Sequence, residues 1–457
     1  MADSAEVDLV VVGLGPGGEH AAAELAGAGL EVVGVDRRLV GGECPYYGCI
    51  PSKMMLRAAG LLAEARRVPG TAGSVEVIPS WSQVARRIRD EATDDWDDAV
   101  AVERLQKAGA RFVRGTGRLA GPGRVVVATD EGEQEIRVRR GVVLNTGTEP
   151  AIPPIDGLAG TPYWTNREAV RVTRLPRSLV VLGGGAIGCE LAQAFARFGV
   201  RVTIVEAGER ILGPEEPESS EVLAAALARD GIEVRTGVAA RSVRHDGGFH
   251  LALDGGESIS ADELLVAVGR TSNLRDIGLE TVGLDPGVRF LDPDERMRVG
   301  EGVWAIGDIT GKGAFTHMSM YQADVAVRDL LGREGAPADY RAVGRVTFTD
   351  PEIGSVGMTE RQARDAGLRV QVGTTDLATS SRGWLHVPGG AGVVKLVADA
   401  DRGILVGGTT AGPSGGEMLG WLATAVHAEV PVATLRSMHF AYPTFHRAIE
   451  PALDALA

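Results

Sequence analysis

The sequence predicts an α/β protein with more than one domain, and three observations support this. The chain has 457 residues, which is long enough for two to four domains of ordinary size. Hydrophobic residues make up 44% and charged residues 24% of it, so a wholly disordered chain is excluded. A strand, a glycine-rich turn and a helix follow one another at two places about 170 residues apart, which is the pattern of repeated βαβ units.

The net charge, the apolar runs and the number of cysteines argue against several classes of protein. The net charge of −14 argues against a nucleic-acid partner or an anionic membrane surface. No apolar run approaches the 18 or so residues that span a bilayer. The N-terminal residues lack the profile of a secretion signal, so a cytoplasmic protein is expected. Three cysteines cannot staple a chain of this length, so a pair that forms is expected to be catalytic.

The first copy of the repeated pattern lies near the N-terminus. An apolar strand is expected over residues 9–12, a helix over 19–28 and a second strand over 30–35, ending at Asp36. The turn between the first strand and the helix holds three spaced glycines: Gly13, Gly15 and Gly18.

The second copy repeats these parts. Strands are expected over 179–182 and 200–205, the latter ending at Glu206, with a helix over 189–198 between them. Its glycines have the same spacing: Gly183, Gly185 and Gly188. In both copies the acidic residue stands 23 positions after the first glycine. A similar glycine spacing at 115–120 is set aside, because Gly-Pro-Gly follows it where a helix should start.

This spacing suits a bound dinucleotide. The first glycine turns the chain, the second lets backbone N–H groups reach a pyrophosphate, and the third lets helix pack on strand. The phosphates would sit at the positive end of the helix, and the acidic residue would accept hydrogen bonds from ribose hydroxyls. The alternative is an ordinary glycine turn in each βαβ unit. Two such sites on one chain predict a flavoprotein that also binds a nicotinamide nucleotide.

The choice between nicotinamide nucleotides depends on the second acidic residue. Glu206 would repel a 2′-phosphate, so NAD(H) is favoured over NADP(H). Arg201 and Arg210 stand nearby in the sequence, and an arginine can reverse that preference.

A cysteine pair, Cys44 and Cys49, follows the first copy. The spacing is not that of a zinc site. On a regular helix, residues five apart are separated by about 7.5 Å along the axis, whereas a disulfide needs Cα atoms within about 6.8 Å. Pairing needs a distorted first turn, which Pro45 and Gly48 permit, and strained disulfides tend to be redox-active. From spacing alone, a redox pair and two packed thiols stay equally open, and Lys53 adds a cation further along the same helix.

The segment 41–53 resembles the active-site segment of the pyridine nucleotide-disulfide oxidoreductases, the family of dihydrolipoamide dehydrogenase, glutathione reductase and mercuric reductase. Further blocks resemble the same family in the expected order, over essentially the whole chain: 144–150, 268–273, 305–308 and 346–357. The resemblance implies two Rossmann-like dinucleotide-binding domains, a C-terminal α+β dimerisation domain, FAD as the cofactor and a homodimer.

The resemblance also implies a role for each matching residue. The FAD site would be formed by Gly13, Gly15, Gly18, Asp36, Lys53, Gly147, Asp308 and His317. The nicotinamide nucleotide would be held by Gly183, Gly185, Gly188 and Glu206. Gly269, in one of the matching blocks, is expected to bind a cofactor, without a choice between the two nucleotides. Lys53 and Glu190 would pair near the flavin N5. Cys44 would attack the substrate disulfide and Cys49 would form the charge-transfer thiolate, whereas Cys189 matches no reactive position and is expected to pack. No metal site is expected.

The C-terminal segment departs from the family pattern. The disulfide-reducing members have a His-Pro-Thr segment that supplies a histidine base, with a glutamate five residues later. Here Tyr442 occupies the base position, Arg447 stands where the glutamate should be, and Glu450 comes three residues too late. A tyrosine with a reference pKa near 10 is a poor base at pH 7, but it can donate a hydrogen bond or stack on a ring. His439 or His446 could replace the base, and the alternative is that both are structural.

Four regions are expected along the chain: an FAD-binding domain at 1–150, an NAD(P)-binding domain at 151–270, a central part completing the FAD site at 271–335, and an interface domain at 336–457. A helical stretch is expected around 81–107. Strands are expected near 344–349 and 392–398.

Three functions are weighed. The leading hypothesis is an FAD enzyme that passes a hydride from NAD(P)H through the flavin to the Cys44–Cys49 pair and on to a disulfide or related sulfur substrate. A quinone reductase of the diaphorase kind would use the flavin directly and leave the cysteines as spectators. A non-enzymatic flavin redox sensor is the third. Mercury as substrate is doubtful, because mercuric reductase uses a C-terminal cysteine pair and no cysteine follows Cys189.

Overall fold

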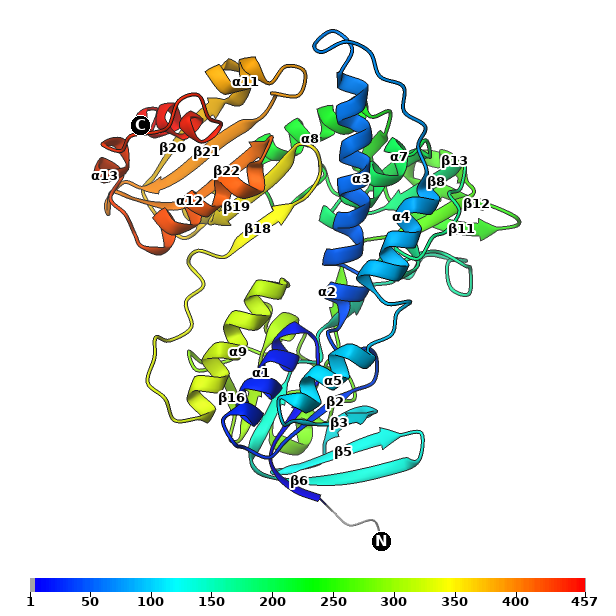
Figure 1. Ribbon diagram of the computed structural model, residues 1–457, viewed down its shortest axis with the longest axis vertical. Helices are drawn as coiled ribbons and strands as arrows, with labels where there is room; N and C mark the ends of the chain where they lie inside the picture. Colours follow the sequence, from blue (N-terminus) through cyan, green and yellow to red (C-terminus); the bar gives the residue numbers. More distant parts are fainter. Residues whose placement is uncertain (1–4, 457) are drawn as a thin grey trace. The chain divides into compact units, whose positions relative to one another are not determined.

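The computed structural model describes residues 5–456, which form two compact units (Figure 1). The first unit combines the residues up to Pro51 with Arg86–Ala151 and Arg270–Asp339. The second combines Ser52–Ala85 and Ile152–Gly269 with the residues from Tyr340 onward. The boundaries of the four regions expected from the sequence stay a prediction, and residues 1–4 and 457, which those regions include, lie outside the described residues.

An eight-stranded sheet forms the centre of the first unit. Six strands lie in the order β16-β17-β6-β1-β2-β3, and β4 and β5 extend it antiparallel from β6. Val12 at the end of β1 lies opposite Val35 and Leu144, so these three parallel strands end at one edge. The strands are β1 (Ala5–Val12), β2 (Val32–Asp36), β3 (Arg111–Arg114), β4 (Thr116–Leu119), β5 (Arg124–Thr129), β6 (Gly132–Leu144), β16 (Arg298–Gly300) and β17 (Val303–Ala305). A separate antiparallel pair is formed by β7 (Thr148–Pro150) and β15 (Arg270–Ser272).

Both faces of this sheet are covered. Leu9 and Val11 face a core shared with the helices, whereas Val10 and Val12 face a second core that includes β5. Helices α1 and α9 lie side by side over the first core (Figure 1). The helical elements of the first unit are α1 (Pro16–Gly27), α2 (Glu43–Tyr46), the first turn of α3 (Cys49–Arg67), α5 (Ala99–Lys107), η3 (Leu279–Val282), η4 (Gly307–Thr310) and α9 (Thr316–Leu330).

The helical stretch expected around 81–107 is only partly right. Helix α4 (Trp81–Arg87) passes into a π-helical turn at Ile88–Ala92 and stops, and α5 begins only at Ala99. Between them Asp94, Asp95 and Trp96 have φ angles of 47°, 53° and 58°. This left-handed backbone ends the helix, because L-residues do not continue a right-handed helix there.

The second βαβ copy lies in the second unit. A four-stranded parallel sheet has the order β10-β9-β8-β14, and Phe195 of α7 packs against Trp81 with ring centroids 5.4 Å apart. The strands are β8 (Ser178–Leu182), β9 (Arg201–Glu206), β10 (Glu233–Thr236) and β14 (Glu263–Val266), with α6 (Asn166–Ala169), α7 (Ala186–Arg197) and α8 (Pro217–Arg229). An antiparallel sheet of β11 (Ala240–His245), β12 (Phe249–Leu253) and β13 (Ser258–Ala261) adjoins it, with a short η2 (Asp254–Gly256).

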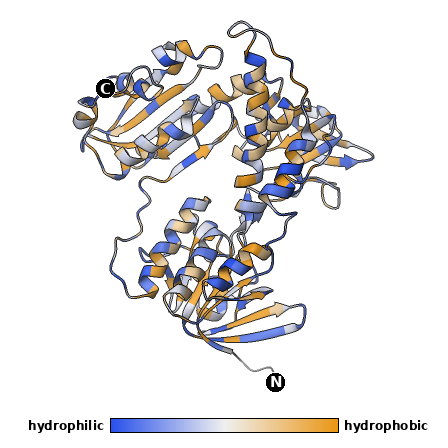
Figure 2. Ribbon diagram, viewed as in Figure 1, coloured by the Kyte–Doolittle hydropathy of each residue, from blue (hydrophilic) through white to orange (hydrophobic). Residues whose placement is uncertain are grey.

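The C-terminal part of the second unit is a five-stranded antiparallel sheet of order β18-β19-β22-β21-β20. Helices α12 and α14 share its core, and β21 is buried along its whole length, including its charged residues Lys395 and Asp399. Figure 2 shows both hydrophobic and hydrophilic colours along the strands of this sheet. The strands are β18 (Gly344–Thr347), β19 (Glu352–Gly357), β20 (Val370–Asp376), β21 (Val393–Asp399) and β22 (Ile404–Gly412). The helices are α10 (Glu360–Asp365), η5 (Leu377–Thr379), α11 (Ser381–Leu385), α12 (Gly415–His427), α13 (Val432–Arg436), η6 (His446–Ala448) and α14 (Ile449–Asp454).

These elements confirm the predicted α/β class and both predicted βαβ copies. Within residues 5–456, no helix is both long and apolar enough to cross a bilayer.

Candidate active site

The first glycine loop joins β1 to α1 in the first unit. Gly13 has φ +92°, and a Cβ there would lie 2.3 Å from the Asn145 carbonyl oxygen. A Cβ on Gly18 would lie 2.0 Å from the Gly13 oxygen. At Gly15 the nearest atom is the Asn145 side-chain nitrogen at 3.4 Å, an ordinary contact. The protein itself therefore requires the first and third glycines, but not the second.

The second loop, between β8 and α7 in the second unit, repeats this arrangement. A Cβ on Gly183 would meet the Ala267 oxygen at 2.4 Å, and one on Gly188 would meet the Gly183 oxygen at 2.0 Å. Nothing lies within 4 Å of a Cβ on Gly185. Gly15 and Gly185 are the N-cap residues of α1 and α7, and neither helix start has a side-chain cap. Both loops thus fit a pyrophosphate, which needs a bare backbone and free helix N–H groups at the second glycine.

The acidic residues at the ends of β2 and β9 hold these loops. Asp36 accepts hydrogen bonds from the backbone N–H groups of Leu14 and Arg38, each at 2.7 Å. Burial raises the pKa of the Asp36 carboxyl, and the two N–H groups oppose that rise. Glu206 accepts hydrogen bonds from the N–H groups of Gly184 at 2.6 Å and Gly208 at 2.7 Å. In both copies the carboxylate therefore accepts a hydrogen bond from the glycine loop after the neighbouring strand.

The cysteine pair lies where two helices meet. Cys44 belongs to the short α2 and is half-buried, whereas Cys49 is the first residue of α3 and is exposed. The chain leaves helical geometry between them, so the regular spacing that would hold them apart does not apply. The Sγ of Cys49 lies 3.5 Å from the Thr316 hydroxyl, at the N-terminal end of α9. A thiolate there is favoured by the positive end of a helix of 15 residues.

The predicted flavin-site residues Gly147, Asp308 and His317 belong to the first unit, where Asp308 contacts the neighbour of Gly147. The Thr148 hydroxyl donates to Asp308 at 2.6 Å and accepts from Nε of Arg270 at 2.7 Å. A guanidinium nitrogen of Arg270 lies 3.5 Å from a carboxylate oxygen of Glu43, the neighbour of Cys44. Gly147 directly precedes β7. Gly269, the last residue of its segment of the second unit, directly precedes β15. His317 is exposed in the first turn of α9, and its ring stacks on Phe315 with centroids 5.3 Å apart.

The predicted Lys53–Glu190 pair is present in the second unit. The ammonium of Lys53 lies 2.7 Å from a Glu190 oxygen, and the other Glu190 oxygen accepts the backbone N–H of Phe348 at 2.8 Å. The Glu190 side chain is buried and the Lys53 side chain is one-third exposed. A buried carboxylate is stable only when charged partners and N–H groups satisfy it, and here both do so.

Cys189, in the first turn of α7, is buried, and burial raises the pKa of its thiol. It donates to the Gly184 carbonyl oxygen at 3.3 Å. Such a thiol is unreactive, which supports a packing role.

Three contacts surround the C-terminal positions at which the family's histidine and glutamate are missing. Tyr442 is 68% exposed, and the Arg447 guanidinium lies 5.5 Å from the centre of its ring. A guanidinium nitrogen of Arg447 lies 3.1 Å from a carboxylate oxygen of Glu450, so Glu450 forms an ion pair with this arginine. His446 packs edge-on against Trp421, burial lowers its pKa, and its Nε2 has no hydrogen-bond partner among the described residues. These features favour a structural role for His446.

The sequence did not single out Asn145, Thr148, Arg270 or Phe348. All four lie in blocks that resemble the family, so the signal was present, but their side-chain partners depend on segments distant in the sequence.

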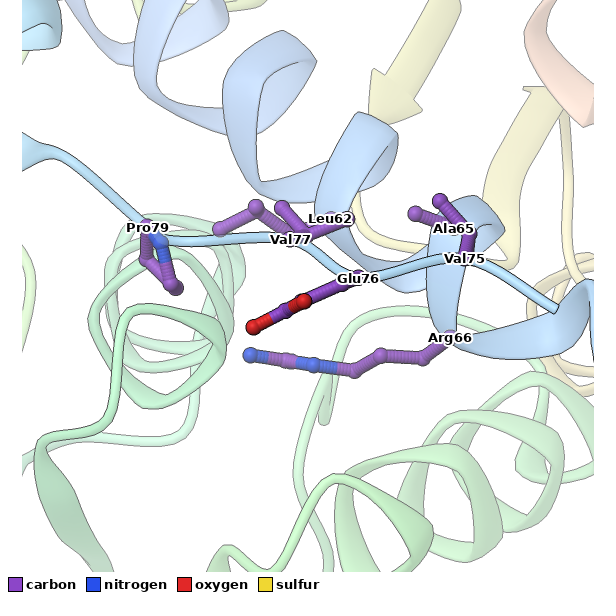
Figure 3. Close-up of a pocket in the computed structure, with 7 residues that line it drawn as sticks. All are labelled: Leu62, Ala65, Arg66, Val75, Glu76, Val77 and Pro79. Atoms are coloured by element: carbon purple, nitrogen blue, oxygen red, sulfur yellow. The ribbon is translucent and has the colours of Figure 1, made fainter.

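A cavity of about 300 Å³ lies between α3 and the extended segment that follows it, and it contains none of the predicted site residues. Figure 3 shows its lining: Leu62, Ala65, Arg66, Val75, Glu76, Val77 and Pro79. Among residues 5–456, no group of three or more His, Cys, Asp or Glu side chains could hold a metal ion.

Comparison with known proteins identifies the family. Residues 7–329 match the family model "Pyridine nucleotide-disulphide oxidoreductase", and residues 343–453 match its dimerisation domain. Dihydrolipoyl dehydrogenase from Chlorobaculum tepidum is 33% identical, over 99% of this chain and 98% of its own. Mercuric reductase from Shigella flexneri is 32% identical, over 96% of this chain and 79% of its own.

Solved structures agree. LpdA from Mycobacterium tuberculosis superposes with a TM-score of 0.86 at 27% identity, covering 98% of this chain and 99% of that one. The HOCl-induced flavoprotein disulfide reductase RclA from Escherichia coli gives a TM-score of 0.83 at 26% identity, with the same coverage. The family depends on FAD and uses pyridine nucleotides. The chain is therefore a flavin-dependent oxidoreductase of the pyridine nucleotide-disulfide oxidoreductase family, as its sequence predicted.

Proposed function

We propose that this enzyme uses NADH to reduce a disulfide or a related sulfur compound through the Cys44–Cys49 pair. The observation that carries the proposal is the place of the pair at the junction of α2 and α3, with Cys49 beside the N-terminal end of α9. Bound FAD would supply two-electron exchange between the nicotinamide and the pair. The residues expected to hold it are Gly13, Gly15, Gly18, Asp36, Gly147, Asp308 and His317.

The two thiols divide the reaction between them. The Cys44 thiolate attacks one sulfur of the substrate disulfide, which forms a mixed disulfide and releases the first thiol. The Cys49 thiolate then attacks Cys44, which restores the internal disulfide and releases the second thiol. Two electrons leave the dithiol, and each departing thiolate takes one proton. The N-terminal end of α9 stabilises the Cys49 thiolate between these steps.

The proposal is tested by counting accessible thiols. After NADH is added to the FAD-loaded enzyme without acceptor, alkylation with N-ethylmaleimide should add two labels to the peptide that contains Cys44 and Cys49. Cys189 is buried and should stay unlabelled in the folded protein, so it serves as an internal control. If NADH bleaches the flavin but adds no label, the dithiol route is wrong.

A quinone reductase is the second candidate, and Tyr442 favours it. A phenol is a poor general base at pH 7, whereas direct electron transfer to a quinone needs no thiol interchange. We further propose a homodimer, because residues 343–453 match the family's dimerisation domain.

Restoring the missing base should raise disulfide turnover. Tyr442→His alone would place an imidazole near the Arg447 guanidinium, which lowers its pKa and keeps it a weak base. The double variant with Arg447→Glu supplies the orienting carboxylate, and we expect lipoamide reduction to rise by about 10²-fold, the lower range for a general base. Steady-state kinetics over pH 6–9 (roughly the range in which imidazole titrates) would measure this. A double variant no faster than Tyr442→His would contradict it.

NADH should be preferred to NADPH. Arg210 donates to the carbonyl oxygens of Leu212, Gly213 and Glu215 and to the Ser220 hydroxyl, so its guanidinium is already committed. Glu206→Gln keeps an oxygen acceptor for the loop but removes the charge that repels a 2′-phosphate. We expect the ratio of kcat/KM for NADH over NADPH to fall by about tenfold, or about 1.4 kcal/mol. The exposed Glu209→Gln is the matched control, and an equal effect of both variants would contradict the role of Glu206.

A further inference from the structure

We infer that Phe348 is a positioning residue that fixes the ammonium of Lys53 beside Glu190. The inference rests on the proposed function, together with the expectation from the family resemblance that the Lys53–Glu190 pair lies near the flavin N5. The ammonium lies 4.6 Å from the centroid of the Phe348 ring and 2.7 Å from Glu190. It is thus held by two attractive groups at once, the negative face of a ring and a carboxylate.

One carboxylate fixes both partners. The Oε2 atom of Glu190 accepts from the Lys53 ammonium, and its Oε1 atom accepts from the backbone N–H of Phe348. Glu190 is only 5% exposed, so its two oxygens have little freedom to turn toward water. A change in the position of Phe348 therefore changes the surroundings of the ammonium directly.

The segment that carries Phe348 is anchored along α7. Gln193 accepts the N–H of Asp350 at 2.7 Å and donates to its carbonyl oxygen at 2.9 Å. Arg197, which is 3% exposed, donates to the Asp350 carboxylate at 2.9 Å, and Arg67 donates to it at 2.6 Å. Residues 190, 193 and 197 lie on one face of the helix, so three successive anchors set where the ring lies.

Core packing does not account for Phe348. Its side chain is 40% exposed, whereas a phenylalanine that serves packing is usually buried. The arginines that hold Asp350 reach neither the ring nor Lys53 in the contacts described. The Phe348 ring is therefore partly exposed, and the Lys53 ammonium lies over its face.

The chain has four lysines, Lys53, Lys107, Lys312 and Lys395, which makes a direct test practical. In protein labelled with ¹³C-lysine, the Lys53 εCH₂ signal, assigned with Lys53→Arg, should lie upfield of the others because of the ring current. Phe348→Leu keeps an apolar side chain and should lose this shift, and Phe348→Tyr should retain it. In stopped flow, Phe348→Leu should slow NADH-dependent bleaching of the FAD-loaded enzyme by about two- to fivefold, as expected for an exposed cation–π contact, and Phe348→Tyr should restore the rate.

An unshifted Lys53 signal in the wild type, or a shift that Phe348→Leu leaves in place, would overturn the inference. So would equal rates in Phe348→Leu and the wild type. The shift is measured without turnover, so it stands even if the thiol count rejects the dithiol route. Conversely, two NADH-dependent labels with an unshifted lysine would reject the role of Phe348 and leave the proposed function intact.

Discussion

Replacing Cys44 by serine should abolish NADH-dependent disulfide reduction, lowering kcat/KM by at least about 10³-fold, as the loss of a nucleophile does in other enzymes. A serine hydroxyl is nearly isosteric but does not ionise near neutral pH, so it cannot attack a disulfide or accept electrons from the cofactor. NADH oxidation should be followed with a panel of small disulfides and, on the same preparation, with a quinone.

The quinone arm makes this experiment decisive. Quinone turnover that stays within about twofold, while disulfide turnover is lost, would show two separate exits for the electrons, since a factor of two is only about 0.4 kcal/mol. Loss of both would mean that quinones too are reduced through the thiols. Disulfide turnover that survives the substitution would refute the dithiol route. The flavin content of the variant, read from its absorbance, controls for a folding defect.

Gly185→Ala should weaken NADH binding without unfolding the protein. The backbone there has φ −75° and ψ −177°, which alanine adopts freely, and nothing lies within 4 Å of the added carbon. The methyl group would instead occupy the approach of the pyrophosphate. We expect KM for NADH to rise by about 10²-fold, or about 2.7 kcal/mol, while the free energy of unfolding changes by less than about 0.5 kcal/mol.

Gly188→Ala, three residues away, is the matched control. Its added carbon would lie 2.0 Å from the Gly183 oxygen. The free energy of unfolding of this variant should therefore fall even without NADH. Denaturant unfolding monitored by circular dichroism would separate the two effects. Normal NADH affinity in Gly185→Ala would show that the pyrophosphate does not approach this loop.

The repeated units were predictable because local sequence determines them. Positive φ at Gly13 and Gly183 and the strand-to-helix turn follow from residues within a few positions. The glycine spacing at 115–120 was set aside correctly, because residues 116–119 form strand β4. The break inside 81–107 was not predicted from the sequence. It coincides with left-handed backbone at Asp94, Asp95 and Trp96, where the Trp96 indole donates to the distant Tyr46 carbonyl oxygen at 3.0 Å, a contact that no local pattern encodes.

The candidate site shows the same division. The Lys53–Glu190 pair was expected, because its members match family positions, and the structure contains it. Phe348 and its anchors were not expected, because they require the turn between β18 and β19 to lie along α7, and no local pattern encodes that. Arg210 differs, because its four partners lie within ten residues along the chain, in a loop whose conformation no local pattern specified.

The hydrogen bonds from Leu14 to Asp36 and from Gly184 to Glu206 bear on how a nucleotide is received. Each carboxylate closes a ring between the end of one strand and the turn after its neighbour, so the turn has its shape before anything arrives. The chain loses the conformational entropy of these turns when it folds. Nucleotide binding therefore does not require that entropy loss a second time. Both loops are thus preorganised for the nucleotides that we propose they bind.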